Sequence, residues 1–381
     1  MKPKFDTIEG RSVLVTGGAG FIGSNLIDAL LANGAARVVA LDNFSTGRRE
    51  NLASALRDPR FELIEADIRD LDACRKAASG IDLIYHEAAL GSVPRSIADP
   101  VTTTEVNIAG FVNMLWAGVQ AGVRRFVYAS SSSVYGGSRE LPKVEAKTGE
   151  PLSPYAITKC VNELYAGNFH ALYGIDAVGL RYFNVFGPRQ NPNGAYAAVI
   201  PNFMAALLAH RSPVINGDGS NSRDFTYVAN VIEANLLAGT VENPEALNTA
   251  YNIAAGRATT LTDLFDLLKS ELAKYDPAVA GIRPEFGPER AGDIPHSLFQ
   301  KRRRCSATGR NSMPGPASRW RRNGTSRMPG RTPNEPPSGG GLRPAGGGKA
   351  FSAPPGARTP RNRPPDRFRA GTPCFLSGRS A

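Results

Sequence analysis

The feature that most constrains the fold is the glycine pattern TGGAGFIG at residues 16–23, which lies between two different periodicities. The run SVLVT before it is short and β-branched, as in a buried strand. The run FIGSNLIDALLANG has the apolar spacing of a helix that stops at Gly34. Glycines at 17, 20 and 23 permit a tight turn, close approach of a pyrophosphate and close helix–strand packing. Because the start of a helix offers unpaired N–H groups, the pattern predicts a phosphate-binding strand–turn–helix unit.

Strand-like and helix-like runs alternate from this turn to about residue 187. The strand-like runs are ARVVALDN, FELIEADI, IDLIYHEAA, RRFVYASSSSVYG and IDAVGLRYFNVFG. The helical runs between them include LDACRKAASG, VNIAGFVNMLWAGVQAG and PYAITKCVNELYAGNFHALYG. Such alternation is typical of α/β proteins with a doubly wound parallel sheet. We therefore expect a Rossmann-like dinucleotide-binding domain over residues 1–187.

The rhythm changes twice after that point. Residues 188–300 are rich in Pro, Asn and Gly with a few helical patterns, and predict a smaller substrate-binding lobe interleaved with the sheet domain. Residues 301–381 contain 13 Pro and 13 Gly and scattered apolar residues without a period. A segment of this kind cannot bury enough apolar surface to offset its chain entropy, so a disordered tail is expected there.

The charge of the chain is divided as sharply as its composition. The formal net charge is +11, but residues 1–300 carry −5 and residues 301–381 carry +16. The body alone therefore gives no reason to expect a nucleic-acid or membrane partner. The four cysteines lack metal-ligand or disulfide spacing, and no run approaches the roughly 18 apolar residues of a membrane span. We expect a cytoplasmic protein without a metal.

Acidic residues follow the next two predicted strands. Asp42 ends the second strand, where a carboxylate accepts both ribose hydroxyls of an adenosine and repels a 2′-phosphate, which favours NAD over NADP. Arg48 and Arg49 lie a few residues further on and leave a 2′-phosphate as the alternative. Asp67 and Ile68 follow the third strand and are candidates for an adenine contact, although Asp67 fits an ordinary strand end equally well.

Tyr155 and Lys159 stand four apart on one predicted helical face, just after the serine run ASSSSVYG. A free phenol, with a pKa of about 10, is a poor base at neutral pH. A nearby ammonium favours the phenolate, so the pair is a candidate acid–base centre.

Together, TGGAGFIG, ASSSSVYG and PYAITK resemble the extended short-chain dehydrogenase/reductase family. The resemblance implies that Tyr155 is the acid/base, that Lys159 binds the nicotinamide ribose of NAD, and that Ser131 contacts the reacting hydroxyl. Ser132 is a second candidate for a substrate contact. Further cofactor contacts implied by the resemblance are Phe21, Ile22, Asn43, Ala88 and Asn107.

Three later segments, RYFNVFGPRQNPNG, NGDGSNSRDFTYV and PERAGDIPHS, resemble the 4-epimerase branch, and closely the UDP-N-acetylglucosamine 4-epimerases of bacterial polysaccharide pathways. The likeness covers residues from about 10 to 298. It implies that Asn184, Arg223 and Arg290 bind the diphosphate of a UDP-sugar and that Asp293 binds the uridine ribose. Gly91 and Ser92 would line the sugar pocket, with the small Ser297 facing position 2 of the sugar.

The resemblance leaves three alternatives. UDP-glucuronate epimerase is one. A 4,6-dehydratase is another, but that branch carries Asp-Glu where this chain has Ser132 and Ser133. A non-catalytic nucleotide-binding scaffold with a nucleic-acid-binding arm is the third, and it requires a genuine basic tail. The abrupt change near Leu298 instead resembles a gene read in a shifted frame.

The resemblance also bears on oligomeric state. In the family, helices like 106–122 and 155–174 form a dimer interface, so we expect a homodimer.

Overall fold

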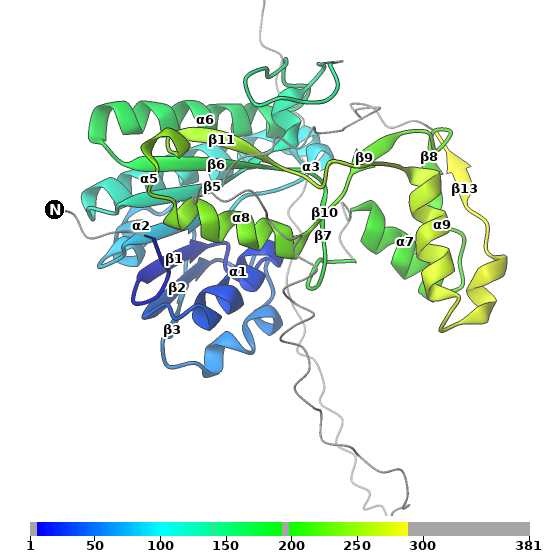
Figure 1. The fold of residues 1–381 in the computed structure, drawn as a ribbon, viewed down its shortest axis with the longest axis horizontal. Helices are drawn as coiled ribbons and strands as arrows, with labels where there is room; N and C mark the ends of the chain where they lie inside the picture. The colour runs from blue at the N-terminus through cyan, green and yellow to red at the C-terminus, as the bar shows by residue number, and fades with distance from the viewer. Residues whose placement is uncertain (1–5, 139, 193–197, 289–381) are drawn as a thin grey trace, which may run out of the picture. The chain divides into compact units, whose positions relative to one another are not determined.

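A seven-stranded parallel sheet forms the centre of the structure, a computed structural model that describes residues 6–138, 140–192 and 198–288 (Figure 1). All of these residues belong to one of the two units into which the chain divides, Met1–Trp320. The predicted tail and the expected site residues Arg290, Asp293 and Ser297 lie outside the described residues.

The order of the strands in the sheet is β11-β6-β5-β4-β1-β2-β3, and every neighbouring pair is parallel. The strands are β1 (Ser12–Thr16), β2 (Arg37–Asp42), β3 (Phe61–Glu65), β4 (Leu83–His86), β5 (Arg125–Ser131), β6 (Asp176–Tyr182) and β11 (Thr249–Ile253). The direction of winding reverses between β1 and β4, which is where sheets of this kind bind their ligands. The predicted Rossmann-like doubly wound fold is confirmed. The seventh strand, β11, was not expected from the sequence.

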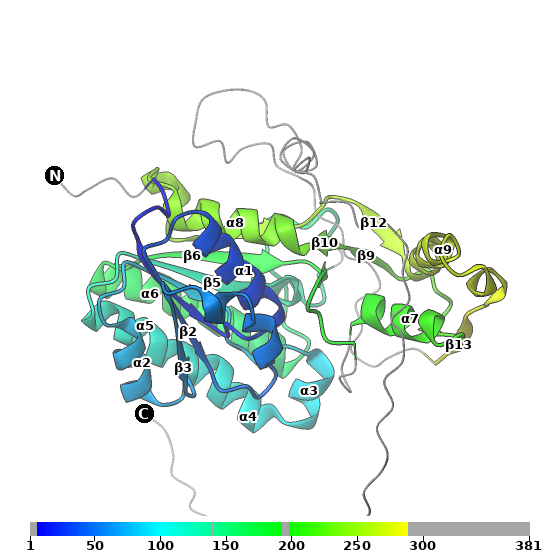
Figure 2. The same cartoon turned by 90° about the horizontal axis from the view of Figure 1, so that it is seen from below.

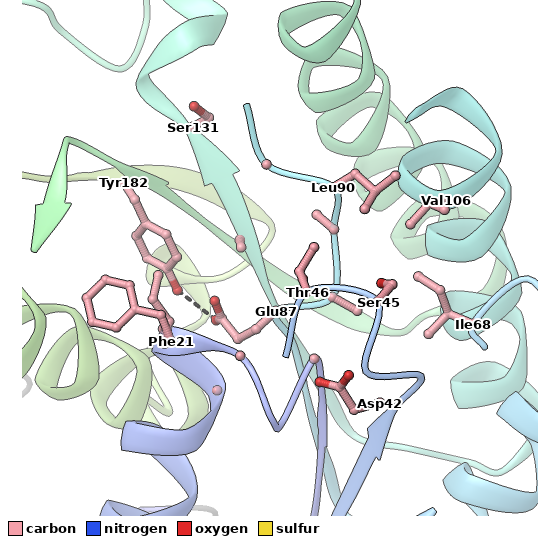
Figure 3. Close-up of a pocket in the computed structure, with 18 of the residues that line it drawn as sticks. Phe21, Asp42, Ser45, Thr46, Ile68, Glu87, Leu90, Val106, Ser131 and Tyr182 are labelled. Carbon is pink, nitrogen blue, oxygen red and sulfur yellow. Dashed lines mark hydrogen bonds between the residues drawn. The ribbon is translucent and has the colours of Figure 1, made fainter. Parts of the chain in front are cut away.

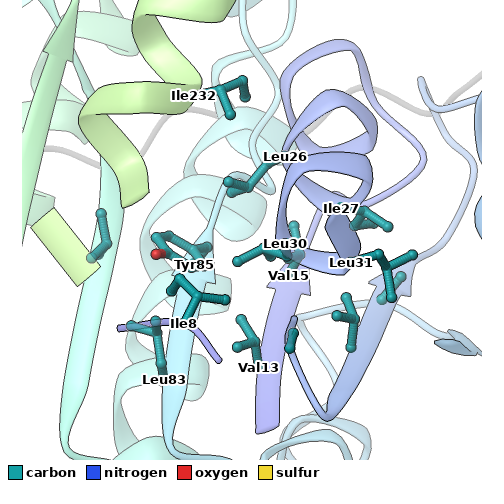
Figure 4. Close-up of a cluster of buried hydrophobic side chains, with 14 of the residues drawn as sticks. Ile8, Val13, Val15, Leu26, Ile27, Leu30, Leu31, Leu83, Tyr85 and Ile232 are labelled. Carbon is teal, nitrogen blue, oxygen red and sulfur yellow. The ribbon is translucent and has the colours of Figure 1, made fainter. Parts of the chain in front are cut away.

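Helices cover both faces of the sheet (Figures 1 and 2). On one face lie α1 (Phe21–Ala32) and α8 (Val228–Thr240), and on the other lie α2 (Leu71–Ala78), α5 (Gly110–Gln120) and α6 (Pro154–Tyr173). Each face has its own apolar core. Figure 4 shows the first, where Leu26 and Leu30 of α1 meet Tyr85 of β4 and Ile232 of α8. Burial on both faces explains the nearly continuous apolar runs of the central strands β1, β2 and β4, whereas the edge strand β3 carries Glu62 and Glu65.

Shorter elements connect these layers. The helices α3 (Val93–Ala98) and α4 (Pro100–Thr104) lead through a π-helical segment, η3 (Glu105–Ala109), into α5. Five 3₁₀ turns complete this set: η1 (Arg49–Leu52), η2 (Ala55–Arg57), η4 (Ser132–Tyr135), η5 (Pro244–Ala246) and η6 (Pro277–Gly281). The serine run is therefore strand up to Ser131 and a tight turn beyond it.

A second group of elements lies away from the sheet in both views (Figures 1 and 2). Its helices are α7 (Val199–Leu208) and α9 (Leu261–Leu272). Its strands are β8 (Val214–Asn216), β9 (Ser222–Asp224), β12 (Ala258–Thr260) and β13 (Glu285–Gly287). The short parallel pair β7 (Val185–Phe186) and β10 (Thr226–Tyr227) lies between this group and the sheet, next to α8. Phe203, Ile215 and Phe265 belong to the separate apolar core of this group. Between its two parts the chain returns to the sheet as α8 and β11. The domain boundary at residue 187 remains a prediction.

The residues that the structure describes contain neither a membrane-spanning helix nor a metal-binding cluster. No helix among them combines the length and apolar character that a membrane span requires. No group of three or more His, Cys, Asp or Glu side chains among them is arranged to hold a metal ion.

Local signals explain why α6 begins just before Tyr155. Ser153 caps the helix by accepting a hydrogen bond from the backbone N–H of Ala156 at 3.2 Å, and Pro154 occupies the first turn. Gly174 ends the helix in the left-handed conformation, with φ of 73°. These caps place Tyr155 in the first turn, at the end of the helix that faces the carboxyl edge of the sheet.

A buried ion pair fixes α6 to the sheet. Arg181 on β6 donates to both carboxylate oxygens of Glu163 on α6, at 2.9 and 2.7 Å. Their side chains are only 6% and 17% exposed. Ser130 on β5 also donates to Glu163, and Arg181 reaches the hydroxyl of Tyr135 in η4 at 2.9 Å. The pair therefore joins two strands, one helix and the serine turn.

We expect Arg181→Met to lower the free energy of unfolding by about 3–5 kcal/mol, because it leaves the Glu163 carboxylate buried without its partner. Urea unfolding would measure the change. Arg37→Met is the matched control, since Arg37 pairs with Glu62 on the exposed surface and is expected to cost about 0–1 kcal/mol. Equal losses in the two variants would show that the buried pair does not anchor α6.

Candidate active site

A cavity of about 440 Å³ opens at the carboxyl ends of β1, β2, β4, β5 and β6. Its volume lies in the range of small-molecule sites. Fifteen of the residues expected from the sequence line it: Gly17, Gly20, Phe21, Ile22, Gly23, Asp42, Asn43, Asp67, Ile68, Ala88, Gly91, Ser131, Tyr155, Lys159 and Asn184. Figure 3 shows Asp42 and Ile68 toward one side of this cavity and Ser131 and Tyr182 toward the other. The structure therefore brings most of the predicted site together.

The glycine turn forms a cradle that a side chain would fill. Gly17 has φ of 67°, and a Cβ atom there would lie 2.8 Å from the backbone of Ala88. A Cβ on Gly23 would lie 2.2 Å from the carbonyl oxygen of Gly17. The turn is fixed by the N–H of Gly17, which donates to the carbonyl of Leu41 at 2.8 Å. The cradle thus exposes backbone at a helix start, which suits a pyrophosphate.

Asp42 braces this cradle as well as lining the cavity. Its carboxylate accepts from the N–H groups of Ala19 and Phe44, each at 2.8 Å. Burial raises the pKa of Asp42, while these two hydrogen bonds oppose the rise. Arg48 is hydrogen-bonded to Asn191 and Arg49 pairs with Glu65, and neither arginine lines the cavity. The local geometry thus favours a ribose at Asp42 over a 2′-phosphate.

Asp67 and Asn43 close the cavity at the ends of β3 and β2. The side-chain amide of Asn43 donates to Asp67 at 2.8 Å, and Arg69 pairs with the same carboxylate at 2.8 Å. The hydrogen bond from Arg69 lowers the pKa of Asp67, so this carboxylate is ionised at neutral pH. Its oxygens already have protein partners, which fits the ordinary strand-end role as well as a ligand contact.

Lys159 is buried beneath the cavity, with 3% of its surface exposed. Its ammonium donates to the carbonyl of Ala129 on β5 at 2.7 Å and lies 5.8 Å from the centre of the Tyr155 ring. Burial lowers the pKa of Lys159 to about 8, although the charges of Glu87 and Glu163 act in the opposite direction. Lys159 therefore links α6 to β5 through this hydrogen bond, and its ammonium is mostly charged at neutral pH.

Tyr155 is not activated by the protein alone. Burial raises its pKa above the usual value, and a hydrogen bond with Ser131 only partly offsets this. Ser131 in turn accepts from the N–H of Ser133 at 3.1 Å. A base role at neutral pH therefore requires a further positive charge or hydrogen bond from a bound molecule.

Asn107 does not line the cavity, although the family resemblance implied a cofactor contact there. Its side chain exchanges two hydrogen bonds with the backbone of Leu90, at 2.8 and 3.2 Å, and donates to Thr158 at 3.2 Å. It lies in the π-helical segment and is 2% exposed. In this structure it joins the loop after β4 to α6. A cofactor contact stays a prediction.

Ser92 and Ser132 also lie outside the lining of the cavity. Ser92 has φ of 145°, a strained conformation for a residue with a side chain, and caps α3 by accepting from the N–H of Arg95 at 3.2 Å. Ser132 begins the 3₁₀ turn directly after Ser131. Their proposed substrate contacts stay predictions.

A second cavity of about 240 Å³ contains Arg223 of β9, and Asn184 lines both cavities. Asn184 donates from its side chain to the carbonyl of Asp224 at 3.1 Å. The two cavities meet at the connection between β6 and β7, where the chain leaves the sheet. Asn184 and Arg223 therefore line one cavity together, and their contact with a diphosphate stays a prediction.

Among the lining residues that the sequence analysis did not predict, two carry titratable side chains, Glu87 and Tyr182. The hydroxyl of Tyr182 donates to the Glu87 carboxylate at 2.7 Å (Figure 3). Their positions in the sequence are the signal that could have predicted them. Glu87 directly follows β4 in HEAA, and Tyr182 ends β6 in RYFN. Both sites lie at strand ends on the ligand-binding edge of the sheet.

Comparison with known proteins gives a consistent result. Residues 13–254 match the family described as "NAD dependent epimerase/dehydratase family". A UDP-glucose 4-epimerase of Mycolicibacterium smegmatis is 40% identical over 298 residues, covering 78% of this chain and 92% of the relative.

Solved structures agree with the sequence comparison. A UDP-N-acetylglucosamine 4-epimerase from Methanobrevibacter ruminantium, in complex with UDP-N-acetylmuramic acid, is 40% identical with a TM-score of 0.71, covering 77% of this chain and 90% of that one. A UDP-glucuronic acid 4-epimerase from Bacillus cereus, in complex with UDP-glucuronic acid and NAD, is 31% identical with a TM-score of 0.69, covering 76% and 90%.

Asp42→Ala is expected to weaken NAD binding and to reduce discrimination against NADP, because it removes the ribose acceptor at the cradle. Calorimetric titration with each dinucleotide would measure both effects. Glu62→Ala, which removes a β3 carboxylate outside the cavity, serves as the control and should leave both affinities unchanged. An unaltered ratio of the two affinities in Asp42→Ala would limit Asp42 to bracing the turn.

Proposed function

The chain belongs to the NAD dependent epimerase/dehydratase family, and from that premise we propose that it inverts carbon 4 of a UDP-sugar, with NAD as its cofactor. One observation carries the proposal: Ser131, Tyr155 and Lys159 line the same cavity as the glycine cradle. The cradle fits a dinucleotide because side chains are excluded from it and Asp42 stands at the expected ribose position. The shared cavity supports the proposal that cofactor binding and proton transfer take place in one site.

Tyr155, Ser131 and Lys159 each have a separate role in the proposed reaction. Bound NAD supplies the hydride chemistry at carbon 4 and a positive charge near the phenol. Tyr155 removes the proton of the 4-hydroxyl as the 4-keto sugar forms, and returns it after the sugar has turned over in the site. Ser131 holds the reacting oxygen by a hydrogen bond, and the Lys159 ammonium stabilises the phenolate.

The 4,6-dehydratase alternative requires an acid and a base near carbons 5 and 6 of the sugar. The residues after Ser131 are Ser132 and Ser133, and a hydroxyl cannot fill either role at neutral pH. UDP-glucuronate epimerisation remains the closer alternative, since it uses the same carbon and the same proton carrier.

For the substrate we favour the pair UDP-N-acetylglucosamine and UDP-N-acetylgalactosamine over UDP-glucose and UDP-galactose. The second cavity, with Asn184 and Arg223, supports a diphosphate leading away from the reacting carbon. The remaining proposed contacts, Arg290, Asp293 and Ser297, lie outside the described residues.

We also propose a cytoplasmic homodimer. Of the two helical segments expected at the interface, 155–174 carries exposed apolar side chains in α6, among them Leu164 at 72% and Leu172 at 63%. No large apolar side chain of 106–122 is exposed, but α4, which packs against α6, adds Val101 at 67%. Exposed apolar groups on adjacent helices are typical of a protein interface. A monomeric mass in light scattering at micromolar concentration would contradict the dimer.

Tyr155→Phe is expected to lower turnover of the UDP-sugar by ~10²–10⁴-fold, because only the proton carrier is lost. NAD binding should be retained, as measured by titration. Tyr165→Phe is the matched control, a tyrosine on the same helix that is exposed and lies outside the cavity. Near-normal turnover in Tyr155→Phe would remove Tyr155 from the proposed role.

Ser297→Tyr is expected to suppress interconversion of the N-acetylated pair while sparing UDP-glucose. The reason is steric, since an acetamido group needs space both before and after the sugar turns over. Rates with both substrate pairs, measured on the same preparation, provide the internal control. An equal effect on the two pairs would mean that Ser297 does not select the substrate.

A further inference from the structure

Glu87 is a carboxyl group at the reacting end of the cavity that the proposed mechanism does not use. It directly follows β4 and lines the same cavity as Tyr155 and Lys159. Figure 3 shows its side chain directed toward Tyr182, away from Asp42. A carboxyl group in this place is unexpected on physical grounds, because a negative charge opposes formation of a phenolate nearby.

A directional chain of hydrogen bonds holds Glu87 as an acceptor. The side-chain amide of Asn235 on α8 donates to the hydroxyl of Tyr182 at 2.8 Å. Because that contact uses an acceptor site of the hydroxyl, its single hydrogen is free to donate to Glu87 at 2.7 Å. The same Asn235 nitrogen donates to the carbonyl of Val231 at 2.9 Å, which identifies it as the amide N–H₂ and fixes the direction of the chain. The contact favours the ionised form of Glu87.

The titratable groups around Glu87 lie on three elements, α6, β6 and β4. Burial raises the pKa of Glu87 to about 7, and the Tyr182 hydrogen bond and the Lys159 charge on α6 limit the rise. Burial is also the largest effect on the pKa of Tyr155, which the Glu87 charge raises further. On β4, burial keeps the pKa of His86 near 3 and that of Tyr85 far above its usual range, so both are neutral.

We propose that Glu87 is a positioning residue that sets the charge felt by Tyr155, so that the proton on its carboxyl group controls the pH range in which the phenol acts as a base. Below neutral pH a protonated Glu87 leaves the Lys159 ammonium as the dominant charge, which favours the phenolate. Between the two titrations the carboxylate balances the ammonium, and above the Lys159 pKa of about 8 the carboxylate is the charge that remains. The inference rests on the acid–base role proposed for Tyr155.

The sign of the expected effect follows from these charges. Glu87→Gln removes the negative charge but keeps an oxygen that accepts from Tyr182. The pKa of Tyr155 should fall, because a nearby anion no longer opposes the phenolate. Glu87→Asp keeps the charge and shortens the side chain. It should therefore leave the Tyr155 titration near that of the natural protein even though the Tyr182 contact is altered.

The test is an ultraviolet titration of tyrosine ionisation in the full chain, without cofactor or substrate. Each protein is compared with the same protein carrying Tyr155→Phe, so that the difference reports Tyr155 alone. We expect the Tyr155 transition to move to lower pH in Glu87→Gln and to stay in place in Glu87→Asp. Tyr182→Phe is a second control, since it disturbs the same contact but leaves Glu87 ionised where Tyr155 titrates.

Two results would overturn the inference. One is an unmoved Tyr155 transition in folded Glu87→Gln, and the other is an equal shift in Glu87→Asp or Tyr182→Phe, which would indicate packing rather than charge. The pH profile of kcat/KM separates this inference from the proposed function. A shifted transition without any UDP-sugar turnover would refute only the function, whereas turnover with an unmoved transition would refute only the role of Glu87.

Discussion

The buried ion pair between Arg181 and Glu163 is the contact on which the site most depends. Glu163 lies one helical turn beyond Lys159 and two beyond Tyr155, so the face of α6 that is fixed by Arg181 is the face that carries both residues. Ser130, the neighbour of Ser131, donates to the same carboxylate. The position of the phenol, the ammonium and the serine hydroxyl is therefore set by one charged contact below them. A buried pair of this kind adds little net stability, and its value here is geometric.

Burial acts on the charged groups of the site in opposite directions. It lowers the pKa of Lys159 and raises the pKa of Glu87, which brings the two titrations close together near neutral pH. It also raises the pKa of Tyr155, which leaves the phenol protonated until a ligand adds positive charge. The protein thus keeps the proposed acid–base group neutral in the absence of a ligand, because burial disfavours the anion.

The sequence predicted those parts of the site that depend on local backbone. The glycine cradle, Asp42 at a strand end and the Tyr155–Lys159 spacing are each encoded by a short local stretch of sequence. The role of Glu87 depends instead on Tyr182, 95 residues away, and on Asn235 of a third element. Asn107 illustrates the converse limit, since the sequence alone does not show that its side chain is hydrogen-bonded within the fold, and its cofactor contact stays a prediction. The strand β11 has the sequence TAYNI, which lacks a continuous apolar run, so it is not recognised without its partner β6.

The return of the chain to the sheet as β11 has a consequence for synthesis. The strand β6 pairs with β11 only after residues 183–248 have been made, so its outer edge stays open while they emerge. The apolar side chains of α7 stay exposed for longer, because Phe203 packs against Phe265 of α9, and α9 follows β11 in the chain. Neither part of the smaller group of elements can bury its core alone. Completion of the sheet and of the second cavity is thus a late event, and the growing chain carries an unpaired edge and bare apolar surface until its last described elements have left the ribosome.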